Sequence, residues 1–186
     1  MRVFINPGHA PNGNPDPGAC NRVTGLRECD VAKNIADLVE KHLVAAGVEV
    51  VGNLQSDDLY EVVHTSNHLD ADVFVSIHCN AFNGVANGTE VWYYHTSGDG
   101  ACLAECIERQ IVDSLDTADR GAKPAVPGKN GLYVLSNTDA VAVLVETAFI
   151  DNADDEELLR HRQDEFARAI ARGVTDYEAQ CGDDNA

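Results

Sequence analysis

The stretch ADVFVSIHCNA, residues 71–81, is the part of the sequence that most directly indicates the fold. Its first half is apolar at almost every position, which is typical of a strand buried on both faces. The run VAVLV, at residues 141–145, has the same character. Such strands occur in parallel sheets that are covered by helices on both sides. The two stretches therefore predict an α/β protein with a mostly parallel sheet.

Strand-like and helix-like segments alternate along the rest of the chain. We expect strands at residues 2–6, 48–52, 72–79, 89–95, 132–136 and 141–147, and helices at residues 29–46, 57–69, 100–115 and 154–178, the last broken near His161. Residues 120–130 contain Gly, Pro and Lys and are expected to form a loop. No repeat or linker is visible, so we expect one domain over residues 1–180 and an acidic tail over residues 181–186.

The chain has 186 residues, enough for a sizeable core, and a formal net charge of −18. This charge disfavours nucleic acid as a partner, because phosphate contacts need Lys and Arg, and it would repel an anionic membrane. No apolar stretch is long enough to span a bilayer, and no signal peptide is visible. We therefore expect neither nucleic acid nor a membrane as a partner.

Six cysteines are present, and none forms a Cys-x-x-Cys motif. Cys102 and Cys106 lie four residues apart, on one face of an expected helix. We favour ordinary core packing for both, with a disulfide or a metal role as the alternative.

Three of the apolar strands end in polar residues of the kind that catalyse reactions. RVFINPGH ends in His9, VFVSIH ends in His78, and VAVLVE ends in Glu146. If the strands are parallel, the three side chains meet at the carboxyl edge of one sheet, where open α/β folds bind their ligands. The sequence therefore predicts a functional site at this edge.

Glu28 lies three residues before Val31 and seven before Ile35, so it projects onto the apolar stripe of its helix. A carboxylate in that position is either a helix-capping or ion-pairing residue, or a metal ligand. Two histidines and one carboxylate form a common catalytic zinc set. With His9, Glu28 and His78 as ligands, Glu146 would remain as a general base for the bound water.

For other polar residues, the sequence pattern gives weaker evidence of a function. His64 and His68 lie four residues apart on an expected helix, but no Glu follows His64 as a His-Glu-x-x-His motif requires. Asn80 lies two residues beyond His78 on the same strand face, so it is a candidate substrate contact, although turn geometry explains an asparagine there equally well.

Several segments of the chain, in order, resemble the zinc-dependent N-acetylmuramoyl-L-alanine amidases of the amidase type 3 family, which are cell-wall hydrolases of bacteria and their phages. The matching segments are NPGH, GLRE, ADVFVSIHCNA, GTEVWYY, RGAKPA, GLYVLSNT and AVLVETAFIDNADDEELL, between residues 2 and 172. The resemblance implies a single zinc ion bound by His9, Glu28 and His78, a catalytic Glu146, and a twisted six-stranded sheet. It also implies cleavage of the amide between the lactyl group of N-acetylmuramic acid and L-alanine of the peptidoglycan stem peptide.

The resemblance carries further expectations. The sequence has Asn6 where the family usually has Asp, and Ala10 where it usually has Gly, and neither change removes an expected ligand. The segment NAFNGVANGTE, after His78, leaves no room for the inserted helix that blocks the site in some relatives, so we expect an open site. The expected partner is peptidoglycan, with a separate wall-binding domain to assist. The expected place of action is the bacterial cell wall, reached by secretion, in the periplasm, or as a phage endolysin.

Two other functions remain open. One is a zinc peptidase that cuts within the stem peptide, and the other is a peptidoglycan-binding module without catalysis. A nucleotide-binding, flavodoxin-like domain would need a phosphate loop after its first strand, and NPGHAPNGN is a poor one.

Overall fold

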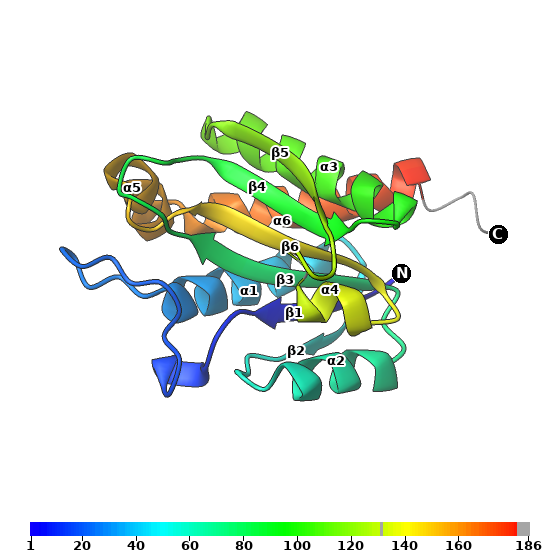
Figure 1. Ribbon diagram of the computed structural model, residues 1–186. Coiled ribbons are helices and arrows are strands. Elements are labelled where there is room, and N and C mark those ends of the chain that lie inside the picture. The colour runs from blue at the N-terminus through cyan, green and yellow to red at the C-terminus, as the bar shows by residue number, and fades with distance from the viewer. Residues whose placement is uncertain (131, 182–186) are drawn as a thin grey trace.

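A six-stranded sheet forms the centre of the computed structural model, which describes residues 1–130 and 132–181 (Figure 1). The strands, in sheet order, are β2 (Glu49–Asn53), β1 (Arg2–Pro7), β3 (Val73–Asn80), β6 (Val141–Phe149), β4 (Thr89–Tyr94) and β5 (Asp119–Ala125). All neighbouring pairs are parallel except β4 and β6, which are antiparallel. The prediction of a mostly parallel, six-stranded α/β sheet is confirmed.

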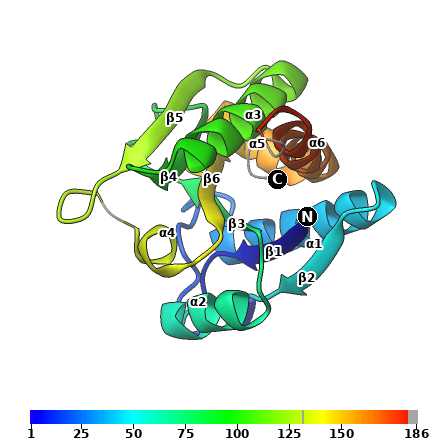
Figure 2. The ribbon, with the colours of Figure 1, turned by 90° about the vertical axis from the view of Figure 1, so that its right-hand side faces the viewer.

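Helices cover both faces of this sheet. They are α1 (Glu28–Ala45), α2 (Leu59–His68), α3 (Gly98–Leu115), α4 (Tyr133–Asn137), α5 (Ala153–His161) and α6 (Gln163–Cys181), with a short 3-10 turn η1 (Pro11–Gly13) after β1. Figure 2 shows α3 and α6 on one side of the sheet and α2 and α4 on the other. Gly173 of α6 lets α3 approach closely, since a Cβ there would lie 2.4 Å from Ile107 Cα.

Each strand divides its apolar side chains between two cores, as its period of two requires. Val3 and Ile5 pack with α1, α3 and α6, whereas Phe4 between them packs with α2 and α4. Val73 and Phe74 of β3 separate in the same way. Both faces of β1 and β3 are therefore buried under helices, which explains why their sequences are apolar almost throughout.

Two local predictions were wrong. Residues 120–130 do not form only a loop, because β5 spans Asp119–Ala125. β5 is an edge strand that pairs only with β4, so its Gly121 and Pro124 are tolerated. Residues 132–136 are not a strand, because α4 spans Tyr133–Asn137 and buries Val134 and Leu135 against the sheet. An apolar run this short fits either a strand or a helical turn.

The C-terminal helical region is broken near His161, as predicted, into α5 and α6. α6 extends to Cys181, and residues 182–186 of the expected acidic tail lie outside the described residues. Cys102 forms a disulfide with Cys181, so its prediction as an ordinary core cysteine was wrong and the disulfide alternative holds. Cys106 is a buried free thiol. Within the described chain, no helix combines the length and the apolar character needed to cross a membrane.

Glu108 of α3 gives a testable pH dependence of stability. Its side chain is buried against β5, and burial, then the neighbouring Asp119 carboxylate, raise the pKa of Glu108 to about 7 from 4.5. Between about pH 4.5 and pH 7, Glu108 therefore keeps its proton in the folded protein but has lost it in the unfolded chain. The stability that this proton contributes is fully present below about pH 4.5 and is lost as the pH rises through about 7.

We expect Glu108→Gln, which resembles the protonated side chain, to stabilise the protein more at pH 8 than at pH 5. A gain of about 1 kcal/mol would raise Tm at pH 8 by about 2–4 °C. Thermal melts of the unmodified protein and of Glu108→Gln at the two pH values measure the difference. An equal effect of the substitution at pH 5 and pH 8 would contradict this account of Glu108.

Candidate metal centre and its surroundings

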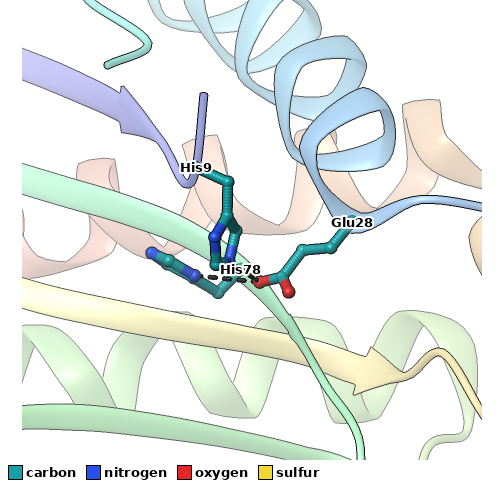
Figure 3. A group of neighbouring side chains, drawn as sticks. All are labelled: His9, Glu28 and His78. Carbon is teal, nitrogen blue, oxygen red and sulfur yellow. Dashed lines mark hydrogen bonds and ion pairs between the residues drawn. The ribbon is translucent and has the colours of Figure 1, made fainter. Parts of the chain in front are cut away.

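Three side chains from separate parts of the chain converge at the carboxyl edge of the sheet. His9 follows β1, Glu28 is the first residue of α1, and His78 lies near the end of β3 (Figure 3). One ligand atom from each lies within 4.8 Å of the others. His9 Nε2 and His78 Nδ1 both lie 2.9 Å from Glu28 Oε1. The structure therefore brings together the three residues that the sequence predicts as metal ligands.

Two glycines make room for this arrangement. A Cβ on Gly8 would lie 2.3 Å from the His78 ring, and one on Gly18 would lie 2.5 Å from the His9 ring. Gly18 also has a φ of +68°, which favours glycine. His9 itself has a φ of 67°, so the turn directs its ring away from the course of β1. These contacts explain why the loop after β1 is rich in glycine.

Glu28 is 4% exposed, and both of its carboxylate oxygens accept hydrogen bonds. Its Oε2 accepts a hydrogen bond from the Ala19 amide at 2.7 Å, and its Oε1 accepts one from the Cys79 amide at 3.0 Å. Burial alone would raise the pKa of this carboxyl, but the contacts with His78 and His9 hold it well below its usual range. Glu28 is therefore a fixed buried anion that pairs with both histidines, as either an ion-pairing residue or a metal ligand would.

Asp16 is a site residue that the sequence did not reveal. Its Oδ2 lies 2.7 Å from His9 Nδ1, and its Oδ1 accepts a hydrogen bond from the Gly18 amide at 2.9 Å. Burial opposes a charge on His9, but Glu28 and Asp16 together raise the pKa of His9 to about 9. Asp16 thereby turns Nε2 of His9 toward Glu28. Only its place in the PDPG turn near His9 could have suggested this role.

Glu146 lies beside the three convergent residues. It is the register partner of His78 between the parallel strands β3 and β6. Burial raises the pKa of Glu146 to about 7, and Glu28 and Glu90 add to the rise while His78 opposes it. Its Oε2 is buried and has no hydrogen-bond partner in the described chain. A buried oxygen without a partner is costly in a structural residue and is common in a functional one.

Asn80 is already engaged by its neighbours. Its amide nitrogen donates to Glu90 Oε1 at 3.1 Å, and its Oδ1 accepts from the Ala81 amide at 2.9 Å. It lines a cleft of about 350 Å³ together with Glu90, Trp92 and Glu146. Its role as a substrate contact stays a prediction.

Four other histidines contact residues outside this centre. His42 contacts Asp164, and His161 lies near Glu157 on α5. His64 and His68 stack on α2 with ring centroids 6.3 Å apart. Among the described residues, His9, Glu28 and His78 are the only three His, Cys, Asp or Glu side chains whose ligand atoms lie close enough together to hold one metal ion.

The centre is open to solvent on the side of α2 and α4. A cavity of about 250 Å³ is lined by His9, His78, Ser56 and Tyr133, among other residues. The connection between β3 and β4 is a short loop over residues 81–88, held by Asp151, which accepts hydrogen bonds from the Phe82 and Gly84 amides. This loop is too short to contain the inserted helix considered above.

Comparison with known proteins identifies relatives along nearly the whole chain. The family model described as N-acetylmuramoyl-L-alanine amidase matches residues 3–176. N-acetylmuramoyl-L-alanine amidase LytC of Bacillus subtilis is 37% identical over 183 residues, which cover 94% of this chain and 35% of the relative. The endolysin of Bacillus phage SPP1 is 34% identical over 183 residues, covering 92% of this chain and 62% of the endolysin.

A solved structure has the same fold. The crystal structure of N-acetylmuramoyl-L-alanine amidase from Clostridium difficile 630 superposes with a TM-score of 0.87 at 30% sequence identity, covering 97% of this chain and 98% of the other. The match thus covers nearly all of that crystallised chain but only about a third of LytC.

Proposed function

The chain belongs to the N-acetylmuramoyl-L-alanine amidase family, and on that premise we propose that it hydrolyses the amide bond between the lactyl group of N-acetylmuramic acid and L-alanine in peptidoglycan. The observation that carries the proposal is the convergence of His9, Glu28 and His78 next to Glu146, whose buried oxygen has no partner. A non-catalytic binding module would not need this set of groups.

The residues at the centre fit a single zinc ion. Two imidazoles and one carboxylate are a common zinc donor set, and Asp16 orients His9 as a carboxylate often orients a zinc-binding histidine. The buried Glu28 anion also favours a cation at this position. Zinc bound there would polarise the scissile carbonyl and acidify a bound water molecule.

Glu146 acts as the proton carrier in this proposal. Its carboxylate accepts a proton from the attacking water and passes it to the nitrogen of the departing L-alanine. The group must be ionised to accept the proton and protonated to release it, and a buried carboxylate beside the three convergent residues can do both. His78, on the neighbouring strand, is the register partner of Glu146, so the proton carrier lies next to one of the three residues that would hold zinc.

We expect Asp16→Asn to weaken zinc binding by about 10- to 100-fold. The substitution keeps the size of the Asp16 side chain but removes the negative charge that orients His9. Competition with a chromogenic chelator measures the affinity. Asp113→Asn, on the exposed side of α3, is the matched control and should bind zinc normally. Equal affinity in Asp16→Asn and in the unmodified protein would remove Asp16 from the metal centre.

Product analysis tests the proposed reaction. Purified peptidoglycan is digested with the zinc-loaded protein, and the soluble products are identified by mass spectrometry. We expect intact stem peptides that begin with a free L-alanine amine. Shorter peptide fragments would instead establish a peptidase, and zinc-bound protein that releases nothing would favour a binding module.

The proposed place of action is the bacterial cell wall. The net charge of −18 opposes approach to an anionic wall, so a separate wall-binding domain would help this catalytic domain to reach its substrate. The greater length of LytC leaves room for such a domain in that relative.

A further inference from the structure

The proposed metal centre borders two adjoining hollows. The first is the cavity of about 250 Å³ described above, which His9 and His78 line and which we call the α2–α4 cavity. The second is the cleft of about 350 Å³ that Glu146 and Trp92 line, which we call the β4 cleft. Leu132 lines both, so the two hollows lie side by side. A substrate whose scissile bond lies between the metal ligands and Glu146 therefore has one half in each hollow.

The floor of the α2–α4 cavity comes from three neighbouring strands. Asn6 of β1 is the register partner of Ser76 of β3, and Ser76 is that of Leu144 of β6. Ser76 Oγ donates a hydrogen bond to Asn6 Oδ1 at 2.8 Å, and Asn6 Nδ2 donates one to the Leu54 carbonyl oxygen at 3.0 Å. The polar groups of the floor thus bind one another, and contacts with a ligand are left to the walls.

Two of the wall residues are the first residues of helices. Leu59 begins α2 and Tyr133 begins α4, and they are 46% and 43% exposed. At the other ends of these helices, Asn67 Nδ2 donates a hydrogen bond to the Asn137 carbonyl oxygen at 3.2 Å, which holds the two helices together. The cavity therefore has two exposed apolar surfaces in a fixed frame, and one of them is an aromatic ring.

Asp57 supplies a carboxylate to the same cavity. Among the described residues, no hydrogen bond or ion pair engages its side chain, whereas the other carboxylate of the lining, Asp16, is held by His9. The described lining contains no Lys or Arg. A group that enters the cavity meets a negative charge and an aromatic ring. This combination suits an uncharged ligand with hydroxyl or amide donors better than an anionic one.

The two halves of the proposed substrate differ in charge. N-acetylmuramic acid is uncharged while its lactyl carboxyl is held in the amide, and it carries hydroxyl groups and an acetamido N–H. An unlinked stem peptide ends in a carboxylate, as any peptide does. Asp57 therefore repels the peptide half, whereas it can accept hydrogen bonds from the sugar half.

The reacting groups indicate the same orientation. Glu146, which would pass its proton to the departing nitrogen, lines the β4 cleft and not the cavity. The peptide that begins at this nitrogen is therefore expected on the side of the cleft. The acyl group then lies on the side of His9 and His78, which line the cavity. A volume of about 250 Å³ is small for a ligand site, so it suits one sugar residue rather than a length of glycan chain.

We propose that the α2–α4 cavity binds the N-acetylmuramyl half of the substrate, with the ring of Tyr133 against the sugar and Asp57 accepting a hydrogen bond from it. The inference rests on the proposed amidase function and adds an orientation to it. The sugar lies between α2 and α4, and the peptide leaves over β4. Tyr133 and Asp57 determine specificity and take no part in bond cleavage.

The test uses two soluble substrates with the same stem peptide. One carries the N-acetylmuramyl group on L-alanine and the other carries only the lactyl group, so the two differ by the sugar alone. We expect the zinc-loaded protein to favour the sugar-bearing substrate by about 10- to 100-fold in kcat/KM. Tyr133→Ala should remove most of this preference by raising KM for the sugar-bearing substrate, and should cleave the lactyl peptide as before.

Three further variants separate the contributions of the cavity. Tyr133→Phe keeps the ring and should keep the preference. Asp57→Ala should lower the preference, again through KM for the sugar-bearing substrate. Tyr60→Ala, at a 66% exposed position of α2 outside the lining of the cavity, is the matched control and should behave as the unmodified protein. Thermal melts should show the same Tm for Tyr133→Ala and Tyr60→Ala, since both side chains are largely exposed.

Equal kcat/KM on the two substrates in the unmodified protein would overturn the inference and leave the amidase function standing. A Tyr133→Ala variant that loses the same factor on both substrates would also overturn it, because the ring would then act on something other than the sugar. If the unmodified protein released L-alanine amines neither from these substrates nor from peptidoglycan, the proposed function itself would fail.

Discussion

Replacing Glu146 by Gln is expected to lower kcat on peptidoglycan by about 10²- to 10⁴-fold, the usual contribution of a general acid–base group. Gln has nearly the same shape but cannot carry the proton from the attacking water to the leaving nitrogen. The loss should appear in kcat rather than in KM, because the substitution leaves the walls of the cleft in place. The rate of release of L-alanine amines, measured at saturating substrate, gives the effect.

The same substitution should leave the fold and the metal centre intact. Glu146 Oε2 has no hydrogen-bond partner in the described chain, so the change breaks no bond of that oxygen, and it removes a buried carboxylate whose burial is unfavourable. The zinc content is therefore expected to match that of the unmodified protein, and the Tm to match or exceed it. Glu157→Gln, at an exposed position of α5, is the matched control and should keep full activity. Near-normal turnover in Glu146→Gln would remove this residue from the mechanism.

Glu28→Gln should abolish zinc binding and, with it, all measurable amidase activity. The neutral amide supplies no negative charge to a cation, and it turns one of the two positions now occupied by carboxylate oxygens into a hydrogen-bond donor. That donor would face either His78 and the Cys79 amide or the Ala19 amide. Zinc content after dialysis should fall from about one ion per chain to almost none.

Because Glu28 is 4% exposed, a loss of folding must be separated from a loss of metal. Circular dichroism of the zinc-free unmodified protein and of zinc-free Glu28→Gln makes this comparison. Glu105→Gln, an exposed glutamate of α3, provides the control for the chemical change alone. Stoichiometric zinc in a folded Glu28→Gln protein would show that this carboxylate is not a ligand.

The sequence predicts the central part of the site because the parallel direction of the strands and the buried stripe of one helix indicate its residues. His9, His78 and Glu146 each follow an apolar run, and parallel strands must bring their carboxyl ends to one edge. Glu28 stands out because it lies on the buried stripe of a helix. These signals are local, so no knowledge of distant contacts is needed to find them.

Other features depend on contacts between distant parts of the chain. Glu90 looks like an ordinary alternating residue of a strand, and only the pairing of β4 with β5 brings Lys123 and Arg120 to it. The Cys102–Cys181 disulfide joins residues that are 79 positions apart, and no local pattern indicates the pairing. Asp16 reaches His9 through the shape of one loop. Tertiary geometry, rather than local preference, decides each of these contacts.

The measurement that tests the account most directly is anomalous X-ray diffraction, at the zinc edge, from crystals of the zinc-loaded protein. The account predicts one strong peak per chain, within ligand distance of His9, Glu28 and His78, with the Glu146 carboxylate facing it across the open side. A peak at another position, such as between His64 and His68, or no peak in a crystal grown with zinc, would contradict the assignment of the metal centre and the mechanism derived from it.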